Sequence, residues 1–397
     1  MELRPYQKEA MSAITRDLIV AGNSICVLPC GSGKSHLIAS TATLSSPVLI
    51  LQPSQELLRQ NVSKLELLVP AGKIGVYSAS FNRREVRKFT FATIQSVYKS
   101  PELFQDVKLV IIDECHGVSV KSLGTMYMAF LSALNVKVIG LTASPYRLTI
   151  GYVVHSAWDM EQVTMLKLIN RMREKNQKEM FWKRIIYHIS HAELIHNGYL
   201  VPLKYIHKPL LPYAEIPINK SHSDYNLEAY TDAIVGLEAK IFSTIAEAQR
   251  LYKHLLVFCA TVSQAQHLSS VIKGSAIVSA DTGKKERQRM VEDFKSGAIQ
   301  TVFNVGVLTT GFDFPELDCI VLLRPTRSLV LYQQILGRLS RVGTGKEYGT
   351  VIDFTGTCKA LGRIETFSLY RTDRGLWDLR TERHDSWHNR VLYSRTV

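Results

Sequence analysis

The sequence predicts an α/β protein made of two tandem lobes, each a doubly wound parallel sheet. Short runs of Val, Ile and Leu recur in both halves of the chain, and amphipathic, helix-like segments separate them. Nearly continuous apolar runs are typical of strands that helices cover on both faces of a parallel sheet. The 397 residues are enough for two domains with separate cores.

Six strand candidates lie in the first lobe, which we assign to residues 1–150. They are Ile25–Leu28, Val48–Leu51, Ile74–Tyr77, Phe89–Ala92, Leu109–Ile112 and Val136–Leu141. The second lobe, residues 205–362, has five candidates. They are Leu255–Cys259, Ala276–Ser279, Thr301–Val305, Cys319–Leu323 and Thr350–Phe354. One of its helices is predicted over Lys284–Lys295, where Ser296-Gly297 ends it.

Two further segments differ in composition from the lobes. Residues 151–204 form a predicted helical connecting segment, because Met160–Ile195 is rich in Met, Leu, Lys, Arg and Glu and lacks proline. Residues 363–397 are rich in Arg and aromatic side chains. We interpret them as a C-terminal appendage, either a short DNA-binding extension or a docked terminal helix.

The segment Pro29-Cys30-Gly31-Ser32-Gly33-Lys34-Ser35 has the features of a phosphate-binding loop. It follows an apolar strand candidate and precedes a helix-like run. Glycines let backbone N–H groups approach phosphates, and a following helix adds its positive N-terminal end. Lys34 can reach the β- and γ-phosphates, and the Ser35 hydroxyl can hold Mg²⁺. The strict pattern has a glycine where Leu28 stands.

A second polar group, Asp113-Glu114-Cys115-His116, follows another buried strand candidate. Asp113 is suited to bind the metal ion, and Glu114 to orient or deprotonate water. Carboxylates at the end of a strand are otherwise often helix caps. Together with the loop, this pair predicts a nucleoside triphosphatase that uses ATP and Mg²⁺.

Composition narrows the class of protein. Lys and Arg number 48 against 35 Asp and Glu, and the net charge of +13 favours a nucleic-acid partner. No stretch approaches the roughly 18 apolar residues of a membrane helix. The N-terminus lacks the apolar core of a signal peptide, so we expect a cytoplasmic location, or the host cytoplasm for a viral protein. The six cysteines lack zinc-ligand spacing, which predicts no zinc.

Read in order, residues 4–354 resemble a superfamily 2 helicase of the DECH-box type, a family with two RecA-like lobes. The matching segments are Leu3-Arg4-Pro5-Tyr6-Gln7, the loop and carboxylate motifs above, Thr142-Ala143-Ser144, Val307–Asp313 and Gln333–Arg341. Phosphate loops of this family lack the early glycine. Within the superfamily the chain is most similar to RadD-like DNA-repair helicases and to phage recombination helicases. RadD-like proteins also carry a cysteine-rich zinc region, which this sequence does not contain.

The resemblance implies roles for individual residues of the nucleotide site. Arg4 and Gln7 would contact the nucleotide, with Gln7 on the base edge, and His116, Thr142 and Ser144 would couple hydrolysis to movement.

From the second lobe, Gly311, Asp313 and Gln334 would contact the nucleotide, and Arg338 and Arg341 would act as arginine fingers. A spacing of three places both arginines on one helix face, where guanidinium groups can chelate phosphate oxygens. A solvated surface stripe is the alternative interpretation of this pair.

Nucleic-acid contacts implied by the family go mostly to phosphates, since a motor does not depend on base sequence. The candidates are Pro53, Ser54, Gln55, Arg59, Thr93 and Gln95 in the first lobe and Thr261, Thr309 and Thr310 in the second. Turns and helix caps use the same residue types.

The function that we expect is an ATP-dependent DNA helicase or translocase that acts on single-stranded or branched DNA in recombination, replication or repair. A single-strand DNA-binding protein is a candidate partner. The alternatives are an RNA helicase, the motor subunit of a restriction or defence complex, and a non-catalytic clamp switched by ATP. Two features disfavour RNA: the Asp-Glu-Cys-His box, and only five residues between Arg327 and Gln333.

Overall fold

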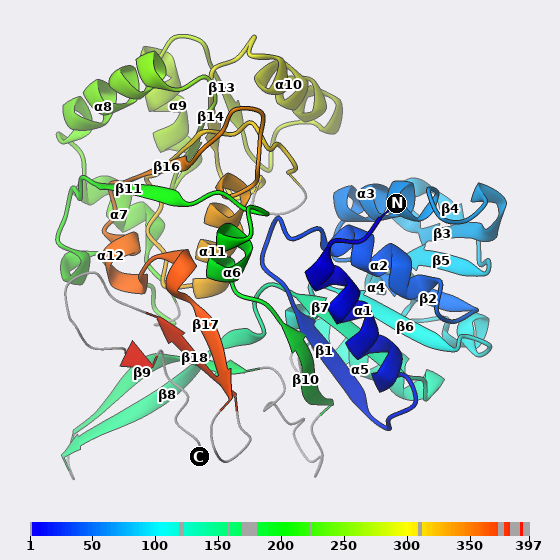
Figure 1. Ribbon diagram of the computed structural model, residues 1–397. Helices are drawn as coiled ribbons and strands as arrows, with labels where there is room; N and C mark the ends of the chain where they lie inside the picture. The colour runs from blue at the N-terminus through cyan, green and yellow to red at the C-terminus, as the bar shows by residue number, and fades with distance from the viewer. Residues whose placement is uncertain are drawn as a thin grey trace. The chain divides into compact units, whose positions relative to one another are not determined.

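The computed structural model describes residues 2–118, 123–156, 159–168, 181–221, 224–308, 312–371, 377–381 and 390–391. It divides into two compact units (Figure 1). The first comprises Met1–Arg147 and Lys167–Ser190, and the second comprises Leu148–Leu166 and His191–Val397. The residues that we assigned to a separate connecting segment are thus shared between the two units.

The first unit is built on an eight-stranded sheet in the order β10-β1-β7-β6-β2-β5-β3-β4. All neighbours pair in parallel except β3 and β4, which are antiparallel. The strands are β1 (Asn23–Val27), β2 (Val48–Leu51), β3 (Ile74–Ser78), β4 (Arg83–Arg84), β5 (Phe89–Ala92), β6 (Leu109–Asp113), β7 (Val138–Thr142) and β10 (Trp182–His188).

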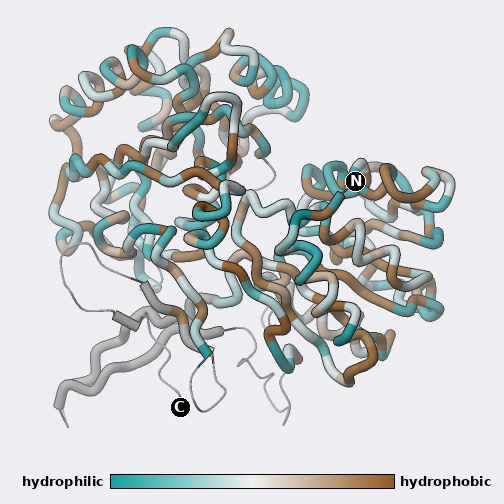
Figure 2. The backbone as a smooth tube through the Cα atoms, viewed as in Figure 1, coloured by the Kyte–Doolittle hydropathy of each residue, from teal (hydrophilic) through white to brown (hydrophobic). Residues whose placement is uncertain are grey.

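Helices cover both faces of this sheet. Every residue of β2, β5, β6 and β7 is buried, and successive residues of a strand point to opposite faces. The continuous apolar runs of the sequence therefore lie in a sheet enclosed on both sides (Figure 2). The helices are α1 (Pro5–Asp17), α2 (Lys34–Ala42), α3 (Gln55–Leu65), α4 (Ile94–Val97) and α5 (Leu123–Leu134).

Register brings the carboxyl ends of separate strands to one edge of the sheet. Val27 of β1 pairs with Thr142 of β7, and Asp113 of β6 pairs with Leu141 of the same strand. The segments that follow these strands consequently start side by side.

The helical prediction for Met160–Ile195 is wrong for the residues that the structure describes. β9 (Asp159–Leu168) pairs with β8 (Tyr146–Ser156) in a two-stranded sheet, and β10 joins the edge of the first sheet beside β1. Only α6 (His191–His196) is helical in this range, and residues 169–180 lie outside the described chain. Helix propensity is a weak preference, which pairing with an open sheet edge overrides.

The second unit holds a six-stranded, all-parallel sheet in the order β11-β16-β15-β12-β14-β13. Its strands are β11 (Leu203–His207), β12 (Leu255–Phe258), β13 (Ser275–Val278), β14 (Thr301–Asn304), β15 (Cys319–Leu322) and β16 (Gly349–Asp353). Its helices are α7 (Leu227–Ala233), α8 (Glu238–Leu251), α9 (Val262–Val271), α10 (Lys284–Ser296), α11 (Leu329–Leu339) and α12 (Thr357–Leu361). The prediction of a second α/β lobe is confirmed.

Described parts of the C-terminal appendage form strands rather than the docked helix that we considered. β17 (Ser368–Arg371), β18 (Trp377–Thr381) and β19 (Arg390–Val391) make an antiparallel three-stranded sheet. Within the described part of the chain, none of the helices combines the length and hydropathy that a bilayer crossing requires.

Trp182 tests whether β10 is an integral strand of the first sheet. Its side chain is 2% exposed, and its ring lies so close to Gly140 of β7 that a Cβ on the glycine would approach it to 2.6 Å. Trp182→Ala is expected to lower the free energy of unfolding by about 3–5 kcal/mol, because it leaves a cavity in the core. Urea unfolding measures the change.

The matched control is Ile19→Ala, at a side chain that is 92% exposed. This control is expected to change the free energy of unfolding by less than about 0.5 kcal/mol. Equal stability of the Trp182→Ala variant and the wild type would contradict the placement of β10.

Candidate nucleotide-binding site

The phosphate-loop segment connects β1 to α2, as the sequence predicts. Gly31 and Gly33 have φ angles of +83° and +75°, in the left-handed region that favours glycine. A Cβ at Gly33 would lie 2.7 Å from Nε2 of Gln7. Ser35 is the second residue of α2, so its half-buried hydroxyl lies at the helix N-terminus beside the loop. This arrangement presents backbone N–H groups at the positive end of a helix.

The N-terminal segment braces the loop. The Tyr6 hydroxyl donates to the Ser32 carbonyl (2.6 Å), and Gln7 Nε2 donates to the carbonyls of Ser32 (3.0 Å) and Gly33 (3.3 Å). Oε1 of Gln7 accepts from the backbone N–H of Arg4 (3.0 Å). Gln7 is 3% exposed, and both ends of its amide are engaged. Contact between Gln7 and a base edge stays a prediction, and it would require exchange of these bonds.

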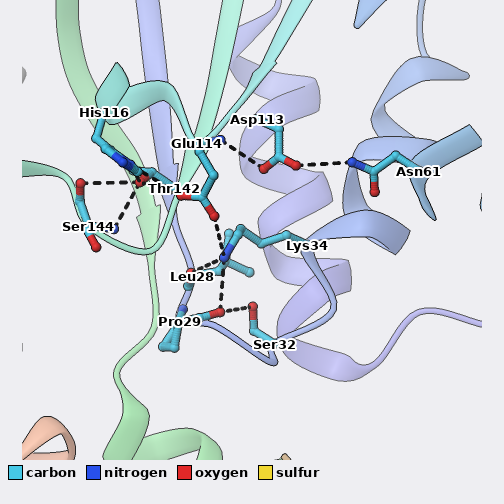
Figure 3. A network of polar contacts seen from close by, with 10 residues as sticks. All are labelled: Leu28, Pro29, Ser32, Lys34, Asn61, Asp113, Glu114, His116, Thr142 and Ser144. Atoms are coloured by element: carbon cyan, nitrogen blue, oxygen red, sulfur yellow. Dashed lines mark hydrogen bonds and ion pairs between the residues drawn. The ribbon is translucent and has the colours of Figure 1, made fainter. Parts of the chain in front are cut away.

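Lys34 lies at the centre of the candidate site (Figure 3). Its Nζ donates to the carbonyls of Leu28 (3.3 Å) and Pro29 (3.4 Å) and lies 3.7 Å from Oε1 of Glu114. The ammonium group thus bridges the loop after β1 and the carboxylate after β6. At Leu28, the departure from the strict loop pattern, the carbonyl accepts from Lys34 and the side chain is buried in the core.

Asp113 ends β6 with its carboxyl group buried. Oδ2 accepts from Nδ2 of Asn61 (3.1 Å), and Oδ1 accepts from the backbone N–H of Glu114 (3.0 Å). Burial, and then the negative charge of Glu114, raise the pKa of Asp113 above its usual range, while Lys34 and the Asn61 hydrogen bond oppose the increase. The carboxyl group therefore lies where a nearby cation would stabilise its charged form.

Glu114 connects the carboxylate motif to the Thr142-Ala143-Ser144 segment. Its Oε2 lies 3.3 Å from Nδ1 of His116 and 3.5 Å from Oγ1 of Thr142, and His116 Nδ1 also lies 2.9 Å from that hydroxyl. The backbone N–H of Ser144 donates to Thr142 Oγ1 (3.0 Å). Figure 3 shows these groups gathered on one side of Lys34. The predicted coupling residues are therefore hydrogen-bonded neighbours of the predicted catalytic carboxylate.

Asn61 of α3, which no motif of the sequence indicated, donates to the Asp113 carboxylate. Asn61 is fully buried, and its Oδ1 has no hydrogen-bond partner among the described residues. Gln52, which follows β2, is equally buried, and both polar atoms of its side chain lack a described partner. A polar residue between the buried Leu58 and Leu65 of α3 was the available signal.

The predicted arginines lie in the second unit and converge on one carbonyl. Arg338 Nη1 and Arg341 Nη1 both donate to the Phe312 carbonyl, and Arg341 also pairs with the Asp313 carboxylate. The single helix face that we predicted is wrong, because α11 ends at Leu339 and Arg341 follows it. Half-buried Gln334 lies on α11, one turn before Arg338.

Predicted nucleic-acid residues of the first unit follow two neighbouring strands, β2 and β5. Ser54 and Thr93 are the N-cap residues of α3 and α4. Ser54 Oγ accepts from the N–H of Leu57 (3.3 Å). The exposed Arg59 lies with its guanidinium carbon 5.0 Å from the Phe81 ring centroid. Three other candidates of this unit are exposed or half-buried at the same edge: Pro53, Gln55 and Gln95.

Of the nucleic-acid candidates predicted in the second unit, the structure describes only Thr261. Thr261 is the N-cap of α9, and its hydroxyl accepts from the N–H of Gln264 (3.2 Å). Thr309, Thr310 and Gly311 lie outside the described residues.

Among the residues that the structure describes, no group of three or more His, Cys, Asp or Glu side chains is placed to hold a metal ion. Five cysteines are buried, and Cys30 of the loop is half-buried.

Comparison with known proteins identifies two domains. Residues 1–147 match the family described as the res subunit of type III restriction enzymes, and residues 239–343 match the helicase conserved C-terminal domain. IRC3 of Saccharomyces cerevisiae, named as an ATP-dependent helicase, is 25% identical over 384 residues, which cover 89% of this chain and 51% of that protein.

The DNA 3'-5' helicase XPB of Kineococcus radiotolerans is 27% identical over 353 residues, covering 86% of this chain and 57% of its own length. The chain thus spans little more than half the length of these two relatives.

Solved structures share the fold at low sequence identity. The type ISP restriction-modification enzyme LlaBIII bound to DNA has a TM-score of 0.62 at 15% identity, covering 89% of this chain and 27% of that chain. The Hef helicase domain of Pyrococcus furiosus has a TM-score of 0.52 at 16% identity, covering 89% and 95%. The two matched domains and the helicase relatives place the chain among the superfamily 2 helicases, and its two parallel-sheet units share the fold of the solved helicase domain.

Proposed function

We propose that the chain is an ATP-dependent DNA helicase or translocase that works in recombination, replication or repair, as RadD-like and phage recombination helicases do. The observation that carries the proposal is the 3.7 Å approach of Lys34 to Glu114, beside the buried Asp113. The contact supports the proposal because it gathers a cation and two carboxylates at one edge, and positioning and charge supply most of the catalysis of phosphoryl transfer. Relatives named as a DNA helicase and a DNA translocase support the choice of DNA.

The residues present fit Mg²⁺ and ATP. Ser35 and Asp113 offer the oxygen ligands that Mg²⁺ prefers, and Mg²⁺ sites usually take only one or two carboxylates from the protein. Two uncompensated features point to a missing polar partner beside Asp113: the raised pKa of its carboxyl group and the unpartnered Oδ1 of Asn61. Bound Mg²⁺–ATP would supply the phosphoryl group whose hydrolysis drives movement.

Each residue of the first unit has a distinct task in this proposal. Backbone N–H groups of residues 30–35 would bind phosphate oxygens, and Lys34 would exchange its carbonyl partners for them. Glu114 orients the attacking water and accepts its proton. His116 and Thr142 hold the Glu114 carboxylate and connect it to Ser144.

The second unit supplies positive charge in the proposed mechanism. Arg338 and Arg341 would leave the Phe312 carbonyl for phosphate oxygens, with Gln334, Gly311 and Asp313 on the nucleotide. Arginine fingers contribute roughly 10³–10⁵ in rate. Hydrolysis would therefore depend on the approach of the two units, and this dependence would couple it to movement along DNA.

A restriction or defence motor is the second candidate. It is favoured by the match of residues 1–147 to the res-subunit family and by the similarity in fold to a DNA-bound restriction-modification enzyme. This candidate shares the ATP site but translocates on intact duplex without separating strands. Displacement of a third strand from a linear duplex, with no unwinding of forks, would favour it over the helicase.

Glu114→Gln tests whether the chain hydrolyses ATP or only switches with it. The amide keeps the shape of the side chain but cannot accept a proton, so turnover is expected to fall by about 10²–10⁴. Binding of a fluorescent ATP analogue should remain, because Lys34 and the loop are intact. Unchanged steady-state turnover would make a non-catalytic clamp the better account. Glu56→Gln, on an exposed carboxylate of α3, is the matched control.

Polynucleotide specificity is the test of the substrate. We expect ATP hydrolysis to be stimulated by single-stranded and forked DNA more than by RNA, and strand separation on forks, flaps or Holliday junctions. Stimulation by RNA alone would overturn the choice of DNA. Affinity for DNA should fall by about 0.7–0.9 log units per log unit of salt for each phosphate contact. Salt-independent binding would contradict a grip on the backbone.

A further inference from the structure

We propose that Lys346 is a positioning residue, whose ammonium group ties the end of α11 to the turn after Phe312 and so fixes the two converging arginines. This inference rests on the proposed function, because it concerns the residues that would act as arginine fingers. Lys346 belongs to none of the motifs that the sequence analysis singled out.

Contacts of Lys346 join two chain segments that carry the arginine site. Its Nζ donates to the carbonyls of Pro315 (3.0 Å) and Leu317 on one side and of Leu339 (2.7 Å) on the other. An ammonium group has three N–H donors, so three carbonyls match its full capacity. Leu339 is the last residue of α11 and lies between Arg338 and Arg341.

The arginines bridge the same two segments a few residues away. Both guanidinium groups donate to the Phe312 carbonyl, three residues before Pro315 in the chain. The ring of Phe312 packs near those of Phe294 and Phe314, which anchors this turn in the core. Lys346 therefore completes a closed set of hydrogen bonds between residues 312–317 and 338–341.

Close packing leaves this turn little room to adjust. A Cβ at Gly343 would lie 2.8 Å from the Pro315 carbonyl oxygen, and the backbone N–H of Lys346 donates to the Gly343 carbonyl (3.2 Å). The backbone thus holds Lys346 against residues 315–317. If the ammonium loses a bond, the end of α11 and the turn can separate, and a displacement of about 1 Å can cost about 10² in rate.

The hydrogen bonds of the Lys346 ammonium group are sensitive to pH, because they depend on its protonation. The pKa of Lys346 is lowered to about 8, first by burial and then by the charge of Arg341, while Asp318 and Glu316 oppose the decrease. His254, next to the same two carboxylates, has its own pKa lowered by burial. A neutral amine has two donors for three carbonyls, so the set of bonds is complete below about pH 8 and incomplete above it.

If Lys346 only stabilised the fold, ATP turnover would follow the pH dependence of stability. The pKa of Lys346 is lower in the folded chain than in the unfolded chain, where it is about 10.5. Between these values the unfolded state binds more protons, so this group's contribution to stability increases as pH rises. A positioning role predicts that ATP turnover decreases over the same interval, so activity and stability move in opposite directions.

The experiment compares nucleic-acid-stimulated ATP hydrolysis of the full chain from pH 6.5 to 9.5 for wild type, Lys346→Arg, Lys346→Met and the control Lys285→Met. Lys285 is an exposed lysine of α10. Wild-type kcat is expected to fall with an apparent pKa near 8. Lys346→Arg should stay active to pH 9.5, because a guanidinium group keeps its charge. Lys346→Met should lower kcat by about 10–100-fold at pH 7, with KM for ATP changed by less than about threefold.

The outcomes separate the two proposals. An inactive wild-type chain at every pH would contradict the proposed function itself. An active wild type whose alkaline loss of kcat is shared by Lys346→Arg would overturn the positioning role alone, as would a Lys346→Met variant within threefold of wild type. Thermal unfolding checks each fold; if Lys346→Met unfolds, the pH profile of Lys346→Arg decides.

Discussion

Parallel strands end at a common edge of their sheet, and the residues that follow them converge there although they are far apart in the chain. The candidate nucleotide site of this chain depends on that geometry. Lys34 follows β1, Glu114 follows β6 and Thr142 ends β7, and register alone brings the three strand ends together. The apolar interior of the sheet then makes every charge at this edge expensive to leave unpaired. Lys34 offsets part of the negative charge of Glu114 and Asp113 at this edge, and the pKa of Asp113 stays raised.

In the second unit, backbone carbonyls accept hydrogen bonds from three cationic side chains, Arg338, Arg341 and Lys346. All three donate to carbonyl oxygens of the 312–317 turn, and Arg341 also pairs with the Asp313 carboxylate. Such a cation can exchange a carbonyl for a phosphate oxygen at modest cost, because charge-assisted bonds to an anion are stronger. In the first unit Lys34 is held in the same way by Leu28 and Pro29. Both units thus hold cations on backbone carbonyls.

Most strands and the glycine loop before α2 could be predicted, whereas several contacts could not. Continuous apolar runs identify strands of a covered parallel sheet, and the predicted runs match β2 and β5 at both ends. β10 was mistaken for helix because its place depends on the open edge of β1, which composition does not reveal. Asn61 was missed for a similar reason: an isolated polar residue on an amphipathic helix has meaning only once Asp113 is known to face it.

The sequence by itself determined the two lobes, the glycine loop and the order of the motifs, because these follow from local patterns of hydropathy and residue type. Only the tertiary structure decided that Gln7 braces the loop and that Arg341 lies beyond α11. It alone revealed that a lysine outside every motif, Lys346, joins the arginine segment to its turn. These features depend on which carbonyls and side chains meet across the fold, and hydrogen bonds between distant segments leave no periodic trace in a single chain.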